Sequence, residues 1–492
     1  MEESVEQLDP TAEITSETVK KRVVSGAAML TIRTIFIQFV SFFSNALLTV
    51  FLLPADYGVF FLVSAVINLL AYFSDIGFAA ALIQKKDKLT QDDLRTIFTA
   101  QQVLIVLLLI VIFIATPFVQ SFYKFNQEGV YLLWALAFSL FVSSLKTIPS
   151  VLMERKLEFN KLVIPQIIET LVFNITVVYL AWKGYGVTSF TIGVIARSIV
   201  GLVSTYIIQP WLPMISFSSK AFKSILKFGL PYQANVFLAM LKDDGMTLFL
   251  GSILGPSGIG LLGWAQKWAY APLRFFMDQV IKVTFPAFSR LQDNKAELSH
   301  LVSRSIFYIC ILVFPTLILL VLLAPSLTQI IPKYNKWSPA LLALTFISIT
   351  SAFASITTPL TNMLNAIGKI SLTFKFMIMW TALTWLFVPF LSIQFGVSGA
   401  GFGFALVGLS SVITIWKCSE FVNIDYFKLL LKPILAVFVM GVLVSLLRSI
   451  LPVSYLSVIS MGLFGLVTYL TLLLILEPEL LSLVKRTIKL RR

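Results

Sequence analysis

The sequence predicts an all-helical polytopic membrane protein with about 14 transmembrane helices. Of its 492 residues, 58% are hydrophobic and only 13% are charged, whereas soluble domains carry about 25% charged residues. Apolar windows of about 20 residues, the length of a helix that crosses a bilayer, recur along almost the whole chain. Basic residues gather in alternate connections between these windows, which is typical of membrane topology.

Each predicted span corresponds to one apolar window. In chain order the windows lie near 26–52, 57–82, 96–119, 129–150, 163–182, 187–209, 229–253, 258–284, 303–325, 338–363, 370–394, 398–418, 430–450 and 455–476. The polar start of the chain, MEESVEQLDPTAEITSETVKK, has no apolar region directly behind a basic one. It therefore predicts a disordered tail and not a cleaved signal peptide.

The distribution of Lys and Arg predicts the orientation. Alternate connections hold Lys20, Lys21, Arg22, Lys85, Lys86, Lys88, Arg95, Arg155, Lys156, Lys161, Lys220, Lys223 and Lys227, and the C-terminal tail holds five more. The connections on the other side hold few. The positive-inside rule then places both termini in the cytoplasm, which requires an even number of spans. The net charge of +14 is thereby explained by topology, and no nucleic-acid partner is expected.

An internal repeat divides the chain. LLPADYGVFFLV at 52–63 resembles ILGPSGIGLLGWA at 253–265, and three further pairs follow in the same order at offsets of about 202 to 210 residues. Six spans separate equivalent points, so the copies have the same orientation. The predicted organisation is a disordered cytoplasmic tail at 1–22, two six-helix lobes at 23–215 and 216–424, transmembrane helices 13 and 14 at 425–478, and a basic cytoplasmic tail at 479–492.

Charged residues inside spans are the candidate functional residues. In the segment 263–286, Lys267, Arg274, Asp278 and Lys282 fall within roughly an 80° arc of a helix. An ionisable side chain at the bilayer centre costs at least about 2.5 to 3.5 kcal/mol, so such residues normally face a bundle interior or an aqueous path. The cations Arg33, Lys146, Arg197 and Lys242 and the acids Asp75, Asp243 and Asp244 also lie in spans.

Enzymatic and metal sites are not expected. His300 is the only histidine, no nucleotide-binding loop is present, and Cys310 and Cys418 lack the spacing of a metal site or a disulfide framework. The sequence therefore predicts no catalytic residues, no metal and no cofactor. ATP-driven transport by this chain alone is excluded.

Several motifs resemble the polysaccharide transporter family, whose members are Wzx-like flippases of lipid-linked oligosaccharides. They are LPADYG at 53–58, FSDIGFAAALIQ at 73–84, MERKLEFN at 153–160 and LGPSGIGLLGWA at 254–265. That family belongs to the multidrug/oligosaccharidyl-lipid/polysaccharide (MOP) flippase superfamily. The resemblance covers the whole chain and implies two six-helix lobes with two extra C-terminal helices.

The resemblance also implies a function. The chain would translocate oligosaccharide repeat units on undecaprenyl diphosphate across the bacterial cytoplasmic membrane, by alternating access through a cationic central cavity. Pathway polymerases and glycosyltransferases would be its partners, beside membrane lipids. The cavity cations would be Arg33, Arg197, Lys242, Lys267, Arg274 and Lys282. Asp75, Asp243, Asp244 and Asp278 would either couple transport to a proton or sodium ion or balance nearby charges.

Three other functions stay open at this point. A cation-coupled multidrug exporter of the same superfamily would share the fold, but its cavity should be weighted toward carboxylates. A peptidoglycan-precursor flippase would share the anionic substrate chemistry. A membrane-embedded polymerase or glycosyltransferase would need loops longer than the roughly 15 to 20 residues available here. Trp264 and Trp268 lie beside the charged arc of Lys267, Arg274, Asp278 and Lys282, where they would stack on sugars.

Overall fold

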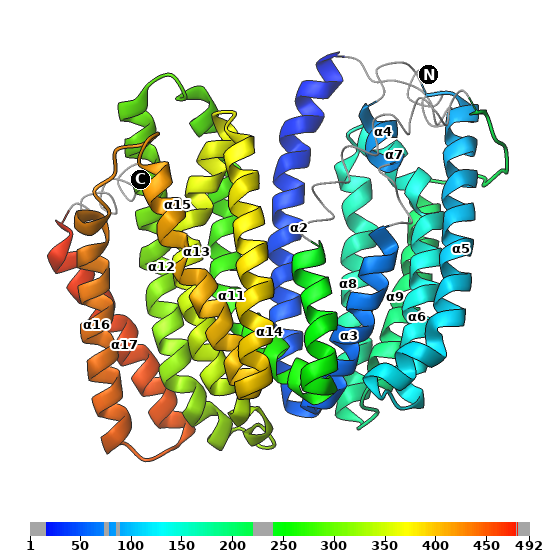
Figure 1. Cartoon of the computed structure of the whole chain (residues 1–492). Coiled ribbons are helices and arrows are strands. Elements are labelled where there is room, and N and C mark those ends of the chain that lie inside the picture. Colours follow the sequence, from blue (N-terminus) through cyan, green and yellow to red (C-terminus); the bar gives the residue numbers. More distant parts are fainter. Residues whose placement is uncertain (1–15, 73–77, 85–88, 220–239, 479, 481–492) are drawn as a thin grey trace. The chain divides into compact units, whose positions relative to one another are not determined.

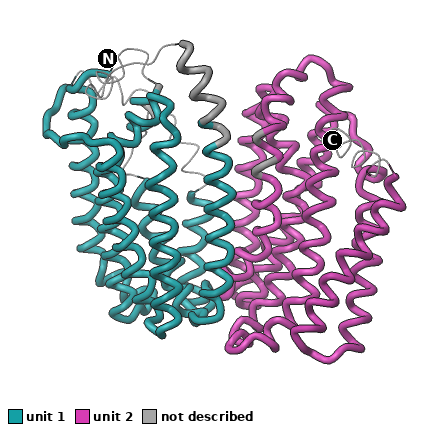
Figure 2. The backbone as a smooth tube through the Cα atoms, turned by 180° about the vertical axis from the view of Figure 1, so that it is seen from behind, with its two compact units in different colours: residues 1–260 teal, residues 261–492 magenta. Residues whose placement is uncertain are grey.

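A computed structural model describes residues 16–72, 78–84, 89–219, 240–478 and 480. Every regular element in these residues is helical. By its contacts the chain forms two compact units, residues 1–260 and 261–492 (Figure 2). The boundary between the two units is defined by contacts between residues, whereas the predicted lobes are defined by the sequence repeat. The two lobes therefore remain a prediction.

The helices of the first unit run side by side (Figure 1). They are α2 (Ser16–Phe51), α3 (Pro54–Ala71), α4 (Phe78–Gln84), α5 (Gln91–Tyr123), α6 (Gln127–Leu145), α7 (Thr147–Arg155), α8 (Phe159–Trp182), α9 (Thr188–Ile208) and the π-helical turn η2 (Leu241–Gly245). α2 begins at Ser16, so its first turns fall within the predicted tail 1–22. Glu17, Lys20 and Lys21 are good helix formers, so α2 extends toward the N-terminus beyond its apolar window.

The second unit holds most of α11 (Met246–Arg290) and all the later helices. These are α12 (Lys295–Ile330), the 3₁₀ turn η3 (Asn335–Ala340), α13 (Leu341–Ala366), α14 (Ile370–Leu409), α15 (Ser411–Cys418), α16 (Tyr426–Ile450) and α17 (Tyr455–Leu476). α16 and α17 pack on each other and on α12. The predicted tail 479–492 lies almost entirely outside the described residues.

Twelve helices among the described residues are long and apolar enough to cross a membrane. Two of these candidates are interrupted by a glycine with positive φ: Gly255 (φ 65°) in α11 and Gly396 (φ 60°) in α14. Both glycines lie in gaps between predicted spans. Pro256 disfavours the helical conformation for Gly255, and glycine adopts positive φ without steric cost. The first part of the predicted span 229–253 lies outside the described residues.

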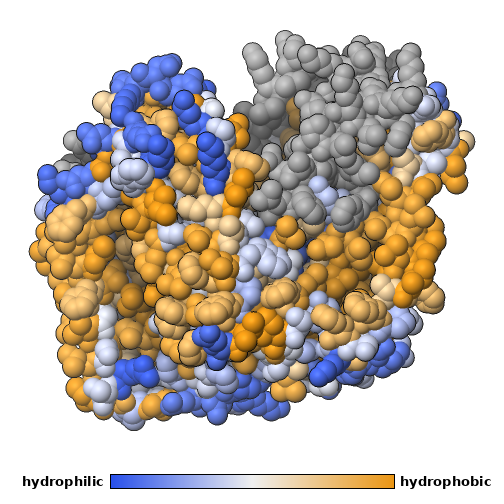
Figure 3. All heavy atoms as spheres, viewed as in Figure 1, coloured by the Kyte–Doolittle hydropathy of each residue, from blue (hydrophilic) through white to orange (hydrophobic). Residues whose placement is uncertain are grey.

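The outer faces of the helices are apolar. On α5, Phe113, Ile114 and Phe118 have exposed fractions of 68%, 71% and 70%. In the second unit, hydrophobic residues cover the middle of the visible face and hydrophilic residues gather at its two ends (Figure 3). Exposed apolar surface of this extent requires lipid around it. The protein is therefore a multi-pass, all-helical membrane protein.

Candidate functional site: cations inside the spanning helices

Three cationic side chains from three segments of the first unit meet one face of α8. The α8 residues that they contact are spaced three and four positions apart, so they lie on one side of the helix. We call this side the α8 contact face. The pairs are Arg33 of α2 with Gln166, Lys146 at the junction of α6 and α7 with Glu169, and Arg197 of α9 with Phe173.

The ion pair between Lys146 and Glu169 is short and sheltered. Their Nζ and Oε1 atoms lie 2.6 Å apart, and the two side chains are 14% and 25% exposed. Gly201 of α9 makes room for the carboxylate, because a Cβ atom there would lie 1.9 Å from Glu169 Oε1. The close packing of α9 on α8 therefore holds Glu169 against Lys146.

Among the described residues, neither arginine has a carboxylate within ion-pair distance. Nη1 of Arg33 donates to Oε1 of Gln166, Nη2 donates to Oγ1 of Thr34 at 3.4 Å, and Nε has no hydrogen-bond partner among the described residues. The guanidinium of Arg197 lies 4.9 Å from the ring centre of Phe173, within electrostatic reach of Glu169. Among the described residues, the α8 contact face thus meets three cations and carries one carboxylate, Glu169. A surplus of positive charge inside spanning helices attracts anions.

A second charged group lies in the π-helical turn η2. Nζ of Lys242 is 3.5 Å from Oδ1 of Asp243, whose side chain is 73% exposed. Oδ1 of Asp244 accepts a hydrogen bond from Nδ2 of Asn68 in α3 at 3.2 Å. Asp243 therefore pairs with the adjacent Lys242, whereas Asp244 links η2 to α3. Single π-helical turns are frequent at functional sites because they displace side chains from the regular helix.

The second unit presents two of the predicted cations on one face of α11. Lys267 and Arg274 are both exposed and lie seven residues apart. Ala265 and Ala269, which are fully buried, lie on the opposite face, where Oγ of Ser351 in α13 donates to the Ala269 carbonyl at 2.7 Å. Packing on α13 thereby turns the charged face away from the unit's core.

The remaining predicted residues have different outcomes. Asp75 lies outside the described residues, and so do the side chains of Asp278 and Lys282. Trp264 is only 4% exposed and stacks on Trp337, with ring centres 5.5 Å apart. A buried indole in this position packs the core and does not offer its face to a sugar, so the stacking interpretation of Trp264 was wrong.

Lys146 is one of the charged residues predicted within spans, but the predicted cavity residues include neither Lys146 nor Gln166 and Glu169. Lys146 lies near the end of its apolar window, where lysines usually reach the interface. The available signal was the spacing of Gln166, Glu169 and Thr170, polar residues on one side of an otherwise apolar span.

This fold is that of membrane transporters. The lipid II flippase MurJ, in an inward closed conformation, superposes with a TM-score of 0.76 at 16% identity, over 92% of this chain and 99% of that one. An inward-facing multidrug resistance MATE family transporter of the MOP superfamily gives a TM-score of 0.60 at 16% identity, over 80% and 98% of the two chains. The chain therefore has a MOP-like fold.

The family is shown by the sequence. A family model described as "Polysaccharide biosynthesis protein" matches residues 47–342, and the chain belongs to this family. The lipopolysaccharide biosynthesis protein WzxC of Escherichia coli (strain K12) is 23% identical over 422 residues, 85% of this chain and 82% of that protein. The teichuronic acid biosynthesis protein TuaB of Bacillus subtilis (strain 168) is 22% identical over 436 residues, 86% and 89% of the two chains. The resemblance to the polysaccharide transporters is thereby confirmed, and the protein is a transporter and not an enzyme.

Proposed function

We propose that the protein translocates lipid-linked oligosaccharide repeat units, carried on undecaprenyl diphosphate, across the bacterial cytoplasmic membrane for cell-surface polysaccharide synthesis. The observation that carries this proposal is the surplus of cations on the α8 contact face, within spanning helices of a polysaccharide biosynthesis family member. A diphosphate needs cationic partners where water is scarce, and arginine binds phosphate with two parallel hydrogen bonds.

In this proposal Arg33, Arg197, Lys242, Lys267, Arg274 and Lys282 line an aqueous path that admits the diphosphate and the glycan. The polyprenyl chain stays in lipid, and the protein alternates between inward-open and outward-open states. Both termini would be cytoplasmic. The membrane potential assists outward movement of an anion by about 2.3 kcal/mol per charge per 100 mV, so ion coupling is not required. Coupling to a proton or sodium ion through one of the acidic residues is open to test.

We also propose that two structural repeats, each of six spans, build the transporter. Supporting this, φ is positive at matched points of the two predicted copies. Lys124 (φ 54°) and Lys333 (φ 63°) form one matched pair, and Gly186 (φ 51°) and Gly396 (φ 60°) form another. The offsets are 209 and 210 residues, within the range found in the sequence. Non-glycine residues rarely adopt positive φ, so agreement at the lysine pair favours a duplicated architecture.

The test is transbilayer movement of a lipid-diphosphate-linked oligosaccharide in proteoliposomes. Arg197→Ala and Arg274→Ala should each slow movement by at least about tenfold, because a charge-assisted hydrogen bond contributes about 1.5–3 kcal/mol. Arg197→Lys and Arg274→Lys should retain part of the rate. Arg448→Ala is the matched control, since Arg448 donates to the Leu322 carbonyl and lies at the exposed end of α16.

Other outcomes would contradict the proposal. Normal movement in both alanine variants would make these arginines structural. If the unaltered protein moved only organic cations, the multidrug-exporter function would replace the proposed one. If it moved only the peptidoglycan precursor, the chain would be a flippase of different specificity.

A further inference from the structure

Glu169 lies among more positive charge than it can balance. Its Oε1 atom is 2.6 Å from Nζ of Lys146, in the ion pair of the α8 contact face. Arg33 and Arg197 reach the same face, and neither has a carboxylate within ion-pair distance among the described residues. Three cations against one carboxylate leave a surplus of two positive charges among these residues. A surplus of this kind attracts a further anion.

Arg197 lies close to Glu169 because α9 packs on α8 in register. On α9, Arg197 and Gly201 are four residues apart and share a face. The guanidinium of Arg197 lies 4.9 Å from the ring centre of Phe173, and Gly201 lies against Glu169. Phe173 and Glu169 are likewise four residues apart, on α8. The guanidinium is therefore about one helical turn from the carboxylate, within its electrostatic reach.

Both arginines keep donors that no described residue uses. Nε of Arg33 is buried without a partner, although Nη1 donates to Gln166 and Nη2 donates to Thr34. Arg197 contacts the Phe173 ring and makes no hydrogen bond to a described residue. A guanidinium carries five N–H donors in a planar fork that matches the oxygens of a phosphate group. Donors therefore remain for an anion on the α8 contact face.

The ion pair between Lys146 and Glu169 is sheltered but not sealed. The two side chains are 14% and 25% exposed, and Arg33 and Arg197 are also partly exposed. All four charged groups are therefore accessible to a small anion.

From this arrangement we propose that Glu169 is a resident counterion, which occupies the place of a phosphate group and is displaced when the diphosphate of the substrate arrives. One phosphate then takes the place of the carboxylate on Lys146, and other oxygens accept hydrogen bonds from Arg33 and Arg197. When the diphosphate leaves, Glu169 pairs with Lys146 again, which favours release. The identity of the ligand rests on the proposed function, whereas the exchange of anions rests on the contacts of these residues.

This exchange favours a ligand with several negative charges. A monovalent anion brings no more charge to Lys146 than Glu169 does, so it gains little by displacing the carboxylate. A diphosphate carries more than one charge and several oxygens, so it can contact Lys146 and an arginine together. Charge-assisted hydrogen bonds to the arginines then offset the loss of the resident ion pair. Glu169 thus excludes small monovalent anions from these cations and admits the diphosphate.

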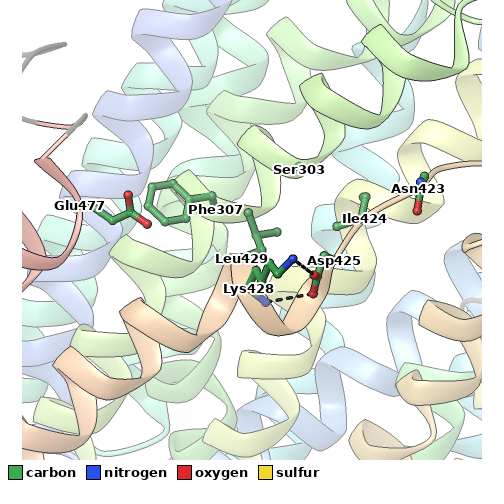
Figure 4. Close-up of a pocket in the computed structure, with 8 residues that line it drawn as sticks. All are labelled: Ser303, Phe307, Asn423, Ile424, Asp425, Lys428, Leu429 and Glu477. Carbon is green, nitrogen blue, oxygen red and sulfur yellow. Dashed lines mark hydrogen bonds and ion pairs between the residues drawn. The ribbon is translucent and has the colours of Figure 1, made fainter.

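A pocket in the second unit shows the opposite balance of charge. It has a volume of about 290 Å³, and its lining includes Asp425, Lys428 and Glu477 (Figure 4). Asp425 pairs with Lys428 at 3.3 Å, and Glu477 pairs with Lys432 at 3.1 Å. Among these described residues two lysines balance two carboxylates, so no surplus remains to attract a further ion. The pair of Glu477 therefore provides a matched control for the pair of Glu169.

The test measures the binding of inorganic pyrophosphate to the full-length protein in detergent. Affinity is obtained from the rise of the thermal unfolding midpoint with pyrophosphate concentration at constant ionic strength. Glu169→Gln should bind pyrophosphate at least about tenfold more tightly than the unaltered protein, because the ligand no longer competes with a carboxylate. Sodium acetate, which supplies a monovalent anion, should produce a much smaller shift in this variant. Adding Lys146→Met to Glu169→Gln should remove the gain in affinity.

Glu169→Asp keeps the inference testable if Glu169→Gln does not fold. Its carboxylate is one methylene shorter and holds Lys146 less closely, so the gain in affinity should be smaller but in the same direction. The control Glu477→Gln should leave the affinity for pyrophosphate unchanged. Unchanged affinity in the Glu169 variants would overturn the inference, and so would an equal gain in Glu477→Gln.

The result also separates this inference from the proposed function. Glu169→Gln could bind pyrophosphate more tightly while the unaltered protein moves no lipid-diphosphate-linked oligosaccharide. That outcome would support the exchange of anions and contradict the proposed function. Movement of the oligosaccharide without any gain in pyrophosphate binding would support the proposed function and overturn the exchange.

Discussion

Gly58 and Gly260 pack against each other's helical segments in a reciprocal contact within the first unit. A Cβ atom on Gly58 would lie 1.6 Å from the Pro256 carbonyl oxygen, and one on Gly260 would lie 1.7 Å from the Pro54 carbonyl oxygen. Pro54 and Gly58 are the residues that the predicted repeat matches to Pro256 and Gly260. Each glycine therefore packs against the proline of the other segment.

This contact tolerates no side chain. We expect Gly58→Ala to lower the free energy of unfolding by about 1–3 kcal/mol, the usual cost of overpacking, because the added methyl group meets backbone atoms that cannot turn aside. Gly260→Ala should have a similar effect. The measurement is the thermal unfolding midpoint of the purified protein in detergent.

Gly462→Ala in α17 provides the control. Its Cβ atom would lie 3.6 Å from Cδ1 of Leu323, an ordinary van der Waals distance. Alanine favours the helix over glycine by about 1 kcal/mol, so this variant should be as stable as the unaltered protein or more so. Equal midpoints for all three variants would contradict the close contact.

The ion pair on the α8 contact face should matter for stability. Glu169→Gln leaves the ammonium group of Lys146 sheltered without its carboxylate, which we expect to cost about 1–3 kcal/mol. The double variant Lys146→Met with Glu169→Gln removes both charges and should recover part of this loss. Gly201→Ala should mimic Glu169→Gln, because the new methyl group would displace the carboxylate. If the double variant lost more stability than the two corresponding single variants together, the ion pair would not be the cause of the loss.

A hydrogen bond to a backbone carbonyl that a proline leaves unpaired should stabilise the packing of α17 on α12. Pro315 has no N–H, so the Ile311 carbonyl lacks its helical partner. The hydroxyl of Tyr469, which is 2% exposed, donates to this carbonyl at 2.8 Å. Tyr469→Phe should therefore lower the free energy of unfolding by about 1–3 kcal/mol, the cost of leaving a buried acceptor unsatisfied.

Tyr455→Phe is the matched control for that experiment. Its hydroxyl donates to the Ile330 carbonyl at 3.1 Å, but the side chain is exposed and water can replace the bond. We expect a smaller change in the unfolding midpoint. A larger loss in Tyr455→Phe than in Tyr469→Phe would contradict the role given to Pro315.

Asp243 and Asp244 should differ in transport. Asp244 is half-sheltered and accepts from Asn68, whereas Asp243 is exposed and pairs with the adjacent Lys242. If a carboxylate couples transport to an ion, we expect Asp244→Asn to abolish the response of transport to an imposed proton or sodium gradient. Asp243→Asn should retain that response. Transport that ignores both gradients in the unaltered protein would assign both acids to charge balance.

The sequence predicted the class of the fold correctly because the bilayer imposes simple rules. A spanning helix needs about 20 apolar residues, so windows such as 187–209 and 455–476 coincide with α9 and α17. Gly255 and Gly396 fall where the apolar windows were expected to end. Helical periodicity also predicted that Lys267 and Arg274 share a face, and both are exposed.

The partners of the charged residues could not be predicted in the same way. Periodicity gives the angle of a side chain around its own helix, but the partner depends on how neighbouring helices pack. Trp264 and Lys267 are three residues apart, yet Trp264 is buried against Trp337 while Lys267 is exposed.

The sequence by itself thus determined that this is a multi-pass helical transporter of the polysaccharide family, because hydropathy and motifs are local properties of the chain. Only the tertiary structure decided that Glu169 pairs with Lys146, that Asp244 pairs with Asn68, and that Gly58 packs against Pro256. These contacts join residues from 23 to 198 positions apart, and their geometry follows from the side-chain volumes at each helix crossing.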